Sequence, residues 1–384
     1  MGTIVERARA NGSTAFLAKI SITRNGKIAH RENKTFDRRA AAAAWIAKRE
    51  EELRAPGEIE RAKTAHITLA DAIDKYTTES RGSIGRTKTQ VLNAIKAHPI
   101  ADMPCGKISS PDIVSFARDL SDGRKPQTVA NYLSHLSAVF TIAGPAWGYA
   151  LDPKAMSDAF IVAKRLRYTK KSAERNRRPT LDELDRIMTH YEDRQRRRPS
   201  MAPMLKIVAF ALFSTRRQEE ITRIAWADLD EANSRVLVRD MKNPGDKSGN
   251  HVWCDLPPEA LEIIQGMPKA GPLIFPYTAD AISASFTRAT AFLGIADLTF
   301  HDLRHEGVTR LFEMGRTIPQ VASVSGHRSW QNLKRYTHIR QAGDKYAGWK
   351  WFDLVNRPMP IPIRMLPSAP CYGGPSPEEQ PPAR

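Results

Sequence analysis

The 384-residue sequence predicts a mainly α-helical protein with small β elements, divided into three domains. Three observations predict this fold class: a period-two apolar pattern near the N-terminus, helical spacing of apolar residues in the region that follows, and a mixed third region behind a run of basic residues. We therefore expect a small sheet-plus-helix module, an all-α domain and a mixed α+β domain, in that order.

Residues 1–57 have the pattern of the first module. Apolar and polar residues alternate from Phe16 to Ile22, which predicts a strand, and Asn25-Gly26 separates it from a second extended run. An Asn-Gly pair between two such runs predicts a hairpin, because both turn positions favour positive φ. Asp37 is placed to cap a helix over 40–53. The module is thus expected to be a hairpin with one helix across it.

Residues 64–165 are predicted to be entirely helical. Thr68 and Ser110 stand where N-cap residues are expected. The expected helices span 69–79, 87–98, 110–120 and 127–142. The last of them carries its large apolar and aromatic residues at helical spacing, which is typical of core packing.

Residues 175–350 are predicted to form the mixed domain. A capping box that begins at Thr180 opens its first helix, and a strongly apolar helix over 204–213 follows. Two short strands at 235–238 and 251–256 are joined by a polar loop, and further helices complete the domain.

The C-terminal part has two segments of different character. Residues 343–355 are rich in aromatic and apolar side chains, and we expect them to dock on a neighbouring protomer, the alternative being that they fold back on their own domain. Residues 356–384 include nine prolines within the last 27 positions, which predicts a disordered tail.

The charge of the chain favours a polyanionic partner. It carries 59 Lys and Arg against 42 Asp and Glu, a formal net charge of +17. Nucleic acid is the first candidate for such a partner, and an ordinary basic surface is the alternative. Eight of the fifteen residues 164–178 are Lys or Arg. This run is either a solvated linker or a strap that lies along a phosphate backbone.

The sequence disfavours several other classes of protein. No apolar stretch is long enough for a membrane span, and the N-terminus has no apolar core of a secretory signal. Cys105, Cys254 and Cys371 lack the spacing of a disulfide framework or a structural zinc site. We therefore expect a soluble cytoplasmic protein without a metal or another cofactor.

Five places in the third region hold residues that suit phosphate chemistry. They are Arg217-x-x-Glu220, Lys242 at the start of the polar loop, His301-x-x-Arg304, Gly326-His327, and Tyr336 in a cationic segment. Residues at i and i+3 share one face of a helix, and a helix N-terminus with an arginine fork suits a phosphate. Each motif is weak alone, because surface Arg–Glu pairs and single His-x-x-Arg matches are common.

The order of these residues resembles that of the tyrosine recombinase, or phage integrase, family. The resemblance covers residues 175–340. The helical region before them is similar to the core-binding domain of the family, and the first module resembles the small DNA-binding domain at the N-terminus of many integrases. The resemblance therefore supports the fold class and the three domains expected above.

One motif departs from the family pattern. The family's Thr-Gly-Leu-Arg reads Ser214-Thr-Arg-Arg217 here. The spacing to Glu220 and Trp226 favours Arg217 over Arg216 as the catalytic arginine. In the polar loop, Lys247 is the alternative to Lys242.

The resemblance implies DNA strand exchange through a covalent 3′-phosphotyrosyl intermediate on the tyrosine, without metal or ATP. Arg217 and Arg304 would stabilise the charge on the phosphate in the transition state. His301 would accept or donate a proton, Lys242 would protonate the leaving 5′ oxygen, and His327 would hold a phosphate oxygen or position the tyrosine.

The same resemblance implies the partners. These are double-stranded DNA attachment or crossover sites held in a C-shaped clamp, further copies of the chain in a tetramer on DNA, and an accessory DNA-bending or directionality protein in some systems. The expected function is a site-specific recombinase that integrates or excises a phage or integrative element. Two alternatives stay open: a catalytically silent DNA-binding protein on the same fold, and a type IB topoisomerase.

Overall fold

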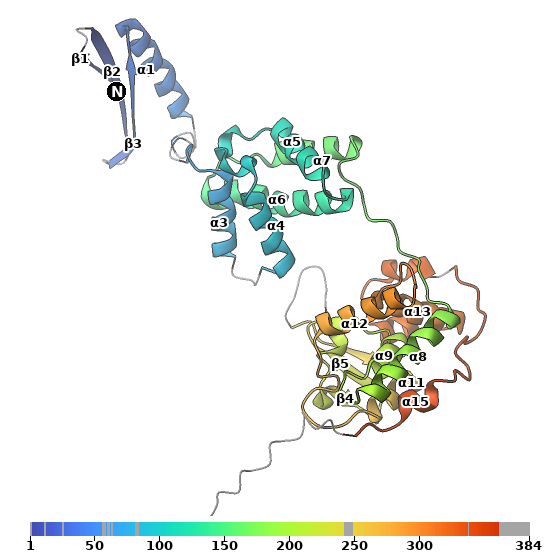
Figure 1. The fold of residues 1–384 in the computed structure, drawn as a ribbon. Helices are drawn as coiled ribbons and strands as arrows, with labels where there is room; N and C mark the ends of the chain where they lie inside the picture. Colours follow the sequence, from blue (N-terminus) through green and yellow to red (C-terminus); the bar gives the residue numbers. More distant parts are fainter. Residues whose placement is uncertain are drawn as a thin grey trace, which may run out of the picture. The chain divides into compact units, whose positions relative to one another are not determined.

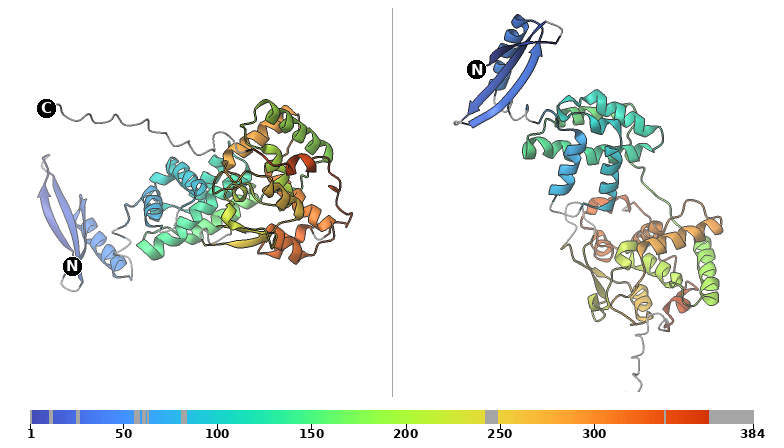
Figure 2. Two further views of the ribbon diagram at one scale, coloured as in Figure 1. Left: turned by 90° about the horizontal axis from the view of Figure 1, so that it is seen from below. Right: turned by 60° about the vertical axis from the view of Figure 1, so that its left-hand side comes forward.

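The chain divides into two units, Met1–Glu174 and Arg175–Arg384, which are described separately. Figures 1 and 2 show the computed structural model in three views. The structure describes residues 2–10, 13–24, 27–55, 59, 62, 64–80, 84–241, 249–336 and 338–360. No helix in these ranges is long and apolar enough to cross a membrane.

The first unit begins with a three-stranded antiparallel sheet of order β1-β2-β3 (Figure 1, dark blue). Its strands are β1 (Thr3–Ala8), β2 (Thr14–Arg24) and β3 (Lys27–Phe36), and α1 (Arg39–Arg54) packs on β2. The predicted pairing of the two later strands is confirmed, although Asn25-Gly26 lies outside the described residues. Strand β1 was not predicted, because it is a mostly exposed edge strand with no buried apolar face to reveal it.

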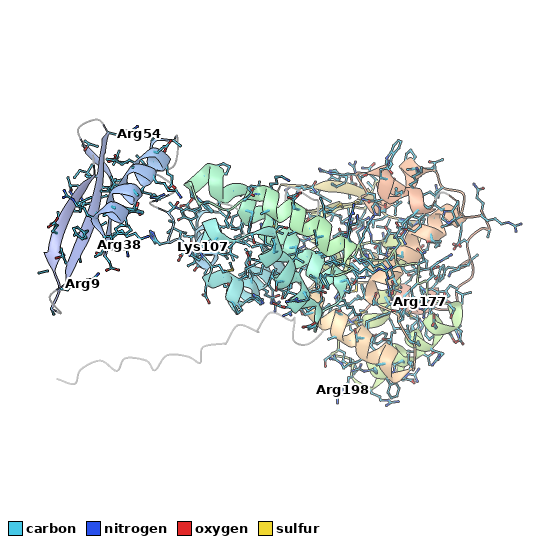
Figure 3. All side chains as sticks on the ribbon, turned by 90° about the horizontal axis from the view of Figure 1, so that it is seen from above. Arg9, Arg38, Arg54, Lys107, Arg177 and Arg198 are labelled. Atoms are coloured by element: carbon cyan, nitrogen blue, oxygen red, sulfur yellow. The ribbon has the colours of Figure 1, made fainter. Side chains whose placement is uncertain are left out.

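The predicted cap of α1 is wrong. The N-cap residue is Arg38, whose side chain makes no capping hydrogen bond. Asp37 instead accepts a hydrogen bond from Arg9 Nη2 at 2.6 Å, which ties the start of the helix to the end of β1. Arg9 and the N-cap residue Arg38 are labelled in Figure 3. The Asp37 carboxylate, which the local sequence pattern predicts to cap the helix, is therefore bound by Arg9.

The rest of the first unit is helical, as predicted, with its own apolar core. Its elements are α3 (Leu69–Glu79), α4 (Arg86–Lys96), η1 (Pro99–Asp102), η2 (Cys105–Lys107), α5 (Ser110–Ser121), α6 (Pro126–Trp147) and α7 (Pro153–Arg165). Thr68 forms the expected cap of α3, as part of a capping box with Asp71. The predicted cap at Ser110 is wrong by one residue, because Ser109 makes the capping box with Asp112.

The second unit is built around α9, a helix whose residues are all buried. Its helices are α8 (Leu181–Arg197), α9 (Met204–Ser214), α10 (Gln218–Ile221), η3 (Trp226–Asp228), α11 (Pro258–Gln265), α12 (Ala279–Phe292), α13 (Phe300–Glu313), α14 (Ile318–Ser325), η4 (Trp330–Asn332), η5 (Lys334–Tyr336) and α15 (Phe352–Asn356). A small antiparallel sheet of order β4-β5-β6 is formed by β4 (Leu229–Asp230), β5 (Arg235–Val238) and β6 (Val252–Asp255). The predicted strand pair is confirmed, and the third strand was not predicted.

Helices α9 and α13 approach so closely that only glycine fits between them. A Cβ atom on Gly307 of α13 would lie 2.0 Å from the Leu212 carbonyl oxygen and 3.0 Å from Thr215 Cγ2. The close contact holds the start of α13, with His301 and Arg304, against the end of α9, which leads into Arg217.

In this structure residues 343–355 fold back on their own unit, which is the second of the two alternatives stated above. The ring of Tyr346 is buried against Phe213, and Trp351 and Val355 also belong to the core of their own unit. The buried Lys206 donates hydrogen bonds from Nζ to the carbonyl oxygens of Val355 and Arg357. Apolar content alone predicts that a segment is covered, but not by which surface. The predicted disordered tail lies, from residue 361 on, outside the described residues.

Candidate active site

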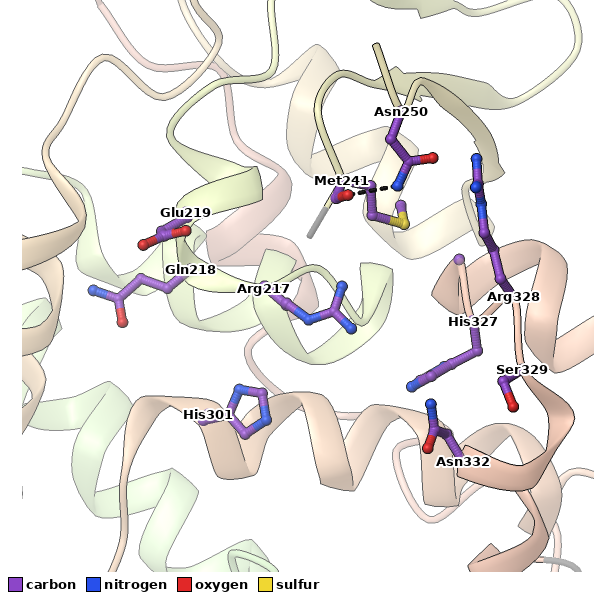
Figure 4. A pocket seen from close by; sticks show the side chains of 11 residues that line it. Arg217, Gln218, Glu219, Met241, Asn250, His301, His327, Arg328, Ser329 and Asn332 are labelled. Carbon is purple, nitrogen blue, oxygen red and sulfur yellow. Dashed lines mark hydrogen bonds between the residues drawn. The ribbon is translucent and has the colours of Figure 1, made fainter. Parts of the chain in front are cut away.

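An open pocket of about 860 Å³ in the second unit brings three of the predicted site residues together. The Arg217 guanidinium and the His327 ring point toward each other across it, and His301 lies on α13 beside them (Figure 4). The residues that line it are Arg217, Gln218, Glu219, Met241, Asn250, His301, Gly326, His327, Arg328, Ser329 and Asn332. Segments far apart in the sequence therefore meet around one space.

Arg217 is placed by the turn between α9 and α10. It is the N-cap residue of α10, and its backbone N–H donates to Glu220 Oε2 at 3.0 Å. The guanidinium Nη1 donates to Glu220 Oε1 at 2.6 Å. Because Glu220 is 2% exposed, it holds the arginine in a fixed orientation toward the pocket.

Arg216 lies in the core, not in the pocket. It is 1% exposed, and it donates to the Ser214 carbonyl oxygen, to Cys254 Sγ and to the Val324 carbonyl oxygen. These partners belong to three segments of the site. The placement supports Arg217 as the arginine of the motif that faces a ligand.

Thr215 explains why the family pattern has glycine at this position. It ends α9 with φ of +58°, in the left-handed region that a β-branched residue rarely adopts. Its carbonyl oxygen accepts a hydrogen bond from Arg304 Nη1 at 2.5 Å. The turn therefore keeps a left-handed residue at this position and presents its carbonyl oxygen to Arg304.

Helix α13 carries His301 in its first turn and Arg304 three residues later, at the predicted start of a helix. Its start is fixed by a capping box between Thr299 and Asp302. Arg304 is 4% exposed and donates from Nη2 to the Ser325 carbonyl oxygen at 3.0 Å and to His327 Nε2 at 3.2 Å. Arg304 thus links the turn before Arg217 to the end of α14.

His327 follows a turn that requires glycine. Gly326 ends α14 with φ of +69°, and a Cβ there would lie 2.5 Å from Met241 Cε. Arg304 can only donate, so His327 Nε2 is the acceptor, and its Nδ1 donates to Ser325 Oγ at 2.7 Å. Burial first, and then Arg304 and Arg217, lower the pKa of His327 to about 3, which keeps this ring neutral.

The pocket has an excess of positive charge. Glu220 Oε2 lies 3.8 Å from Arg216 Nη1 and 4.0 Å from Arg304 Nη1, so three arginines share one carboxylate. Burial would raise the pKa of Glu220, but these arginines lower it. Desolvation, Arg304 and Arg217 also lower the pKa of His301. Such a site favours an anion.

Tyr336 is not among the residues that line the pocket, but it contacts His305, whose ring packs on the pocket residue His301. Tyr336 is 8% exposed, its ring stacks on Phe312 with centroids 6.0 Å apart, and its hydroxyl lies 2.7 Å from His305 Nδ1. His305 was not predicted as a site residue. The signal that could have found it is its spacing of four residues from His301, which places both rings on one face of α13.

The two candidate loop lysines, Lys242 and Lys247, lie outside the described residues. The base of their loop is at the pocket: Met241 N–H donates to the Asn250 carbonyl oxygen at 2.8 Å, and Asn250 Nδ2 donates to the Met241 carbonyl oxygen at 2.6 Å (Figure 4). Both residues line the pocket, so the loop starts and ends at its rim.

Part of the basic run 164–178 is used inside the second unit. Arg175 holds the Asp302 carboxylate with two hydrogen bonds of 2.6 and 2.7 Å, and Arg178 pairs with Glu306 at 2.6 Å. Arg177 pairs with Glu183. Arg335, next to Tyr336, donates to the carbonyl oxygen of Arg175 at 2.5 Å. Arg175, Arg177 and Arg178 are thus paired with carboxylates of the second unit, which disfavours the phosphate strap for this end of the run.

No group of three or more His, Cys, Asp or Glu side chains is arranged to hold a metal ion in the part of the chain that the structure describes. The charged groups that face the pocket are cations and histidines, with Glu219 at the rim.

Comparison with known proteins identifies the family. Residues 177–342 match the model of the phage integrase family. The chain is 31% identical over 288 residues to a shufflon-specific DNA recombinase of Escherichia coli. The aligned region covers 71% of this chain and 70% of that protein. The chain belongs to the phage integrase family. It is a tyrosine-type site-specific DNA recombinase.

Solved integrase structures have the same fold. A lambda integrase dimer bound to a COC′ core site is similar with a TM-score of 0.54 and 21% identity, over 87% of this chain and 94% of that one. The Tn1549 transposon integrase in complex with transposon right end DNA is similar with a TM-score of 0.56 and 15% identity, over 75% of this chain and all of that one. The predicted fold class, mainly α with small β elements, is confirmed.

Proposed function

We propose that this recombinase cleaves and rejoins DNA through a covalent 3′-phosphotyrosyl link on Tyr336, and that it integrates or excises a phage or integrative element. The observation that carries the proposal is the pocket in which Arg217 and His327 converge beside His301, with Arg304 buried behind them. Three arginines in and behind this pocket lie near one buried carboxylate, so the site has excess positive charge. The negative charge of a phosphodiester would balance it.

In the proposed reaction the tyrosine oxygen attacks phosphorus and the bond to the 5′ oxygen breaks. Arg217 and Arg304 stabilise the charge on the non-bridging oxygens. The tyrosine proton passes to His301 or to solvent, and Lys242 donates a proton to the leaving 5′ oxygen. The phosphotyrosine keeps the energy of the broken bond, so the reverse attack by a 5′ hydroxyl rejoins a strand without ATP.

The contacts of His327 refine its proposed role. In the free protein its Nε2 accepts from Arg304, so it has no proton there to give to a phosphate oxygen. An anion in the pocket would draw the Arg304 donor toward itself and favour a proton on Nε2. His327 would then donate to the phosphate.

We further propose double-stranded DNA crossover sites and a tetramer of this chain as the partners, with the helical part of the first unit as the core-binding domain and the N-terminal sheet as a second DNA contact. A lambda integrase tetramer bound to a Holliday junction, similar with a TM-score of 0.55 and 20% identity, supports the assembly. An accessory DNA-bending or directionality protein stays a prediction, as does a cytoplasmic location.

A covalent trap tests the proposal. The protein is mixed with nicked duplexes tiled from the DNA that flanks its gene, and the residue linked to DNA is located by mass spectrometry. We expect an adduct on Tyr336 that is absent from Tyr336→Phe and present in the control Tyr277→Phe. An adduct on another tyrosine, or tight binding without any adduct, would contradict the proposal.

Two further measurements separate the alternatives. Arg217→Ala is expected to slow adduct formation by at least about 100-fold while DNA binding changes little, because one transition-state donor is lost. A silent DNA-binding protein would form no adduct. A type IB topoisomerase would relax supercoiled plasmid of unrelated sequence, which we expect this protein not to do.

A further inference from the structure

Two elements of the site are anchored to one short segment, residues 175–176. The first element is the start of α13, which carries His301 and Arg304, and the second is η5, which ends at Tyr336. The segment opens the second unit, so all of these contacts lie within that unit.

The Arg175 guanidinium makes four hydrogen bonds at the start of α13. Nε and Nη2 donate to the two carboxylate oxygens of Asp302 at 2.6 and 2.7 Å. Nη1 donates to Asp297 Oδ1 at 2.8 Å, and Nη2 also donates to the Asp297 carbonyl oxygen at 2.6 Å. A bidentate arginine–carboxylate pair fixes the orientation of both groups. Arg175 thereby joins the helix to the loop that leads into it.

Asp302 is the residue through which this contact reaches the site. Its carboxylate is fully buried and also accepts hydrogen bonds from the Thr299 N–H at 2.7 Å and from Thr299 Oγ1 at 2.9 Å, in the capping box of α13. Burial would raise the pKa of Asp302, but Arg175 and Thr299 lower it. Without Arg175 the buried carboxylate would lose two hydrogen bonds and its counter-charge. Since Asp302 lies between His301 and Arg304 in the chain, these two side chains move with it.

The same segment anchors η5 through Arg335. Its Nη2 donates to the Arg175 carbonyl oxygen at 2.5 Å and to Asn176 Oδ1 at 2.6 Å. The guanidinium also lies over the ring of Tyr336, 5.3 Å from the centroid. Because the side chain of a nucleophile changes its partners during a reaction, its place depends on the residues beside it in the chain. Arg335 is such a neighbour of Tyr336.

The position of η5 relative to α13 matters for the chemistry. Burial first, and then Arg217, lower the pKa of Arg304 to about 9, whereas Tyr336 raises it. The hydroxyl of Tyr336 therefore lies within electrostatic reach of Arg304. A displacement of about 1 Å from the reactive geometry can slow a reaction about 100-fold.

We propose that Arg175 is a positioning residue, which with Asn176 forms a clasp between the start of α13 and η5. The clasp sets where the nucleophile stands relative to His301 and Arg304. The inference rests on the proposed function in naming Tyr336 as the nucleophile.

Arg177 provides a matched control. It pairs with Glu183, the carboxylate that caps α8, as Arg175 pairs with the carboxylate that caps α13. Its contact near α13 is a long hydrogen bond of 3.3 Å to the Ala296 carbonyl oxygen. Helix α8 carries none of the predicted site residues.

Hydrogen exchange of the full-length, DNA-free protein, followed on peptides by mass spectrometry, tests the clasp. In Arg175→Ala we expect the peptides that cover the start of α13 and η5 to exchange about tenfold faster, because hydrogen bonds to charged groups are lost. Arg177→Ala is expected to leave both peptides at wild-type rates. Wild-type exchange of either peptide in Arg175→Ala would overturn the inference.

Single-turnover adduct formation on nicked duplexes gives the second readout. At saturating DNA we expect Arg175→Ala to form the Tyr336 adduct about 30-fold more slowly, with half-saturation within about twofold of wild type. Both quantities are expected to stay at the wild-type values in Arg177→Ala. An unchanged limiting rate in Arg175→Ala would overturn the inference, whether or not DNA affinity falls.

Calorimetry shows whether the variant is folded. Where Arg175→Ala lacks the thermal unfolding transition of the second unit, Arg175→Lys replaces it. Lysine keeps the charge beside Asp302 without the bidentate fork, so about threefold slower adduct formation is expected. A wild-type rate in Arg175→Lys would then overturn the inference.

The exchange measurement uses no DNA, so the two proposals can fail separately. An adduct on another tyrosine, with faster exchange in Arg175→Ala, would remove the nucleophile role of Tyr336 and leave the clasp standing. An adduct on Tyr336 with wild-type exchange would keep the recombinase chemistry and remove the clasp.

Discussion

Glu220 is the single carboxylate on which the three arginines of the site converge. Arg217 is bound directly to Oε1, whereas Arg216 and Arg304 lie near Oε2 at 3.8 and 4.0 Å. The pocket therefore has more positive charge than the protein neutralises. A phosphate would supply the balance, and the cations would be in place before it arrives.

Arg216 shows how a buried charge can act on the pocket without lining it. It contributes to the low pKa of His327, after burial, Arg304 and Arg217. Arg216→Leu restores the residue of the family pattern, and replacement of a buried charge by an apolar side chain of similar size is often tolerated. We expect a folded protein in which the pKa of His327 rises, as measured by NMR titration.

Arg216→Lys is the matched control for this prediction, because it keeps the charge and shortens the reach. The pKa of His327 is expected to stay low in it. A His327 titration that is the same in the Leu variant and in wild type would show that Arg216 serves packing alone.

The crossing of α9 and α13 sets the geometry of both arginine motifs. Gly307→Ala would place a Cβ 2.0 Å from the Leu212 carbonyl oxygen, so the helices have to separate. We expect a loss of about 3 kcal/mol or more in the free energy of unfolding, measured by urea titration. Gly123→Ala, where nothing lies within 4 Å, is the control and is expected to change it by less than about 0.5 kcal/mol. Similar losses in both variants would contradict this account of the crossing.

The segment that follows Tyr336 completes the core of its own unit. Deletion of 344–384 removes Tyr346, Trp351 and Val355, all of them buried. We expect the truncated chain to lose the thermal unfolding transition of the second unit in calorimetry, since several large side chains leave the core together. A chain that ends at residue 360 is the control and is expected to keep the transition. Survival of the transition in the shorter chain would favour a segment that is free to dock elsewhere.

The three histidines near the site make the stability of the whole protein depend on pH. The pKa values of His305 and His327 are lowered to about 4 and 3, and that of His301 is lowered as well, whereas a histidine in the unfolded chain has a pKa near 6.5. Between about pH 6.5 and 4 the unfolded state binds protons that the folded state does not. Stability is therefore lost as the pH falls through this range.

We expect a loss of at most about 2 kcal/mol for each of His305 and His327 between pH 7 and pH 5. The measurement is the free energy of unfolding of the second unit as a function of pH. His327→Gln is expected to flatten the slope, and the exposed His338 provides a control in His338→Gln. An equal slope in wild type and His327→Gln would contradict the prediction.

Part of the basic charge of the chain stabilises the second unit and is not free to contact DNA. Arg175, Arg177 and Arg178 are bound by carboxylates of the second unit, so they stabilise the domain that follows the linker. The link from Arg335 to Arg175 also joins the start of this unit to the residue next to Tyr336. The net charge of +17 already subtracts these carboxylates, so the ion pairs decide which arginines are free to contact DNA and leave the net charge unchanged.

The elements that the sequence predicted correctly are those set by local rules. Helix α3 begins at a capping box and the strands β5 and β6 flank a polar loop, as their patterns indicate. The order of Arg217, His301, Arg304, His327 and Tyr336 was enough to predict the family, because spacing along the chain is itself the signature. Strand β1 and the cap of α1 were missed or wrong, since an exposed edge strand and a cross-chain ion pair leave no periodic pattern.

Tertiary packing decided the rest. The spacing to Glu220 selected Arg217 over Arg216, but the burial of Arg216 depends on partners in β6 and α14, more than 35 residues away along the chain. Helix α13 likewise supplies the hydrogen-bond partners of the Tyr346 and Tyr336 hydroxyls, which are Glu306 and His305. The periodic pattern of a sequence predicts which side chains are buried. It does not predict which residue each buried side chain contacts, because that depends on how the helices and strands pack together.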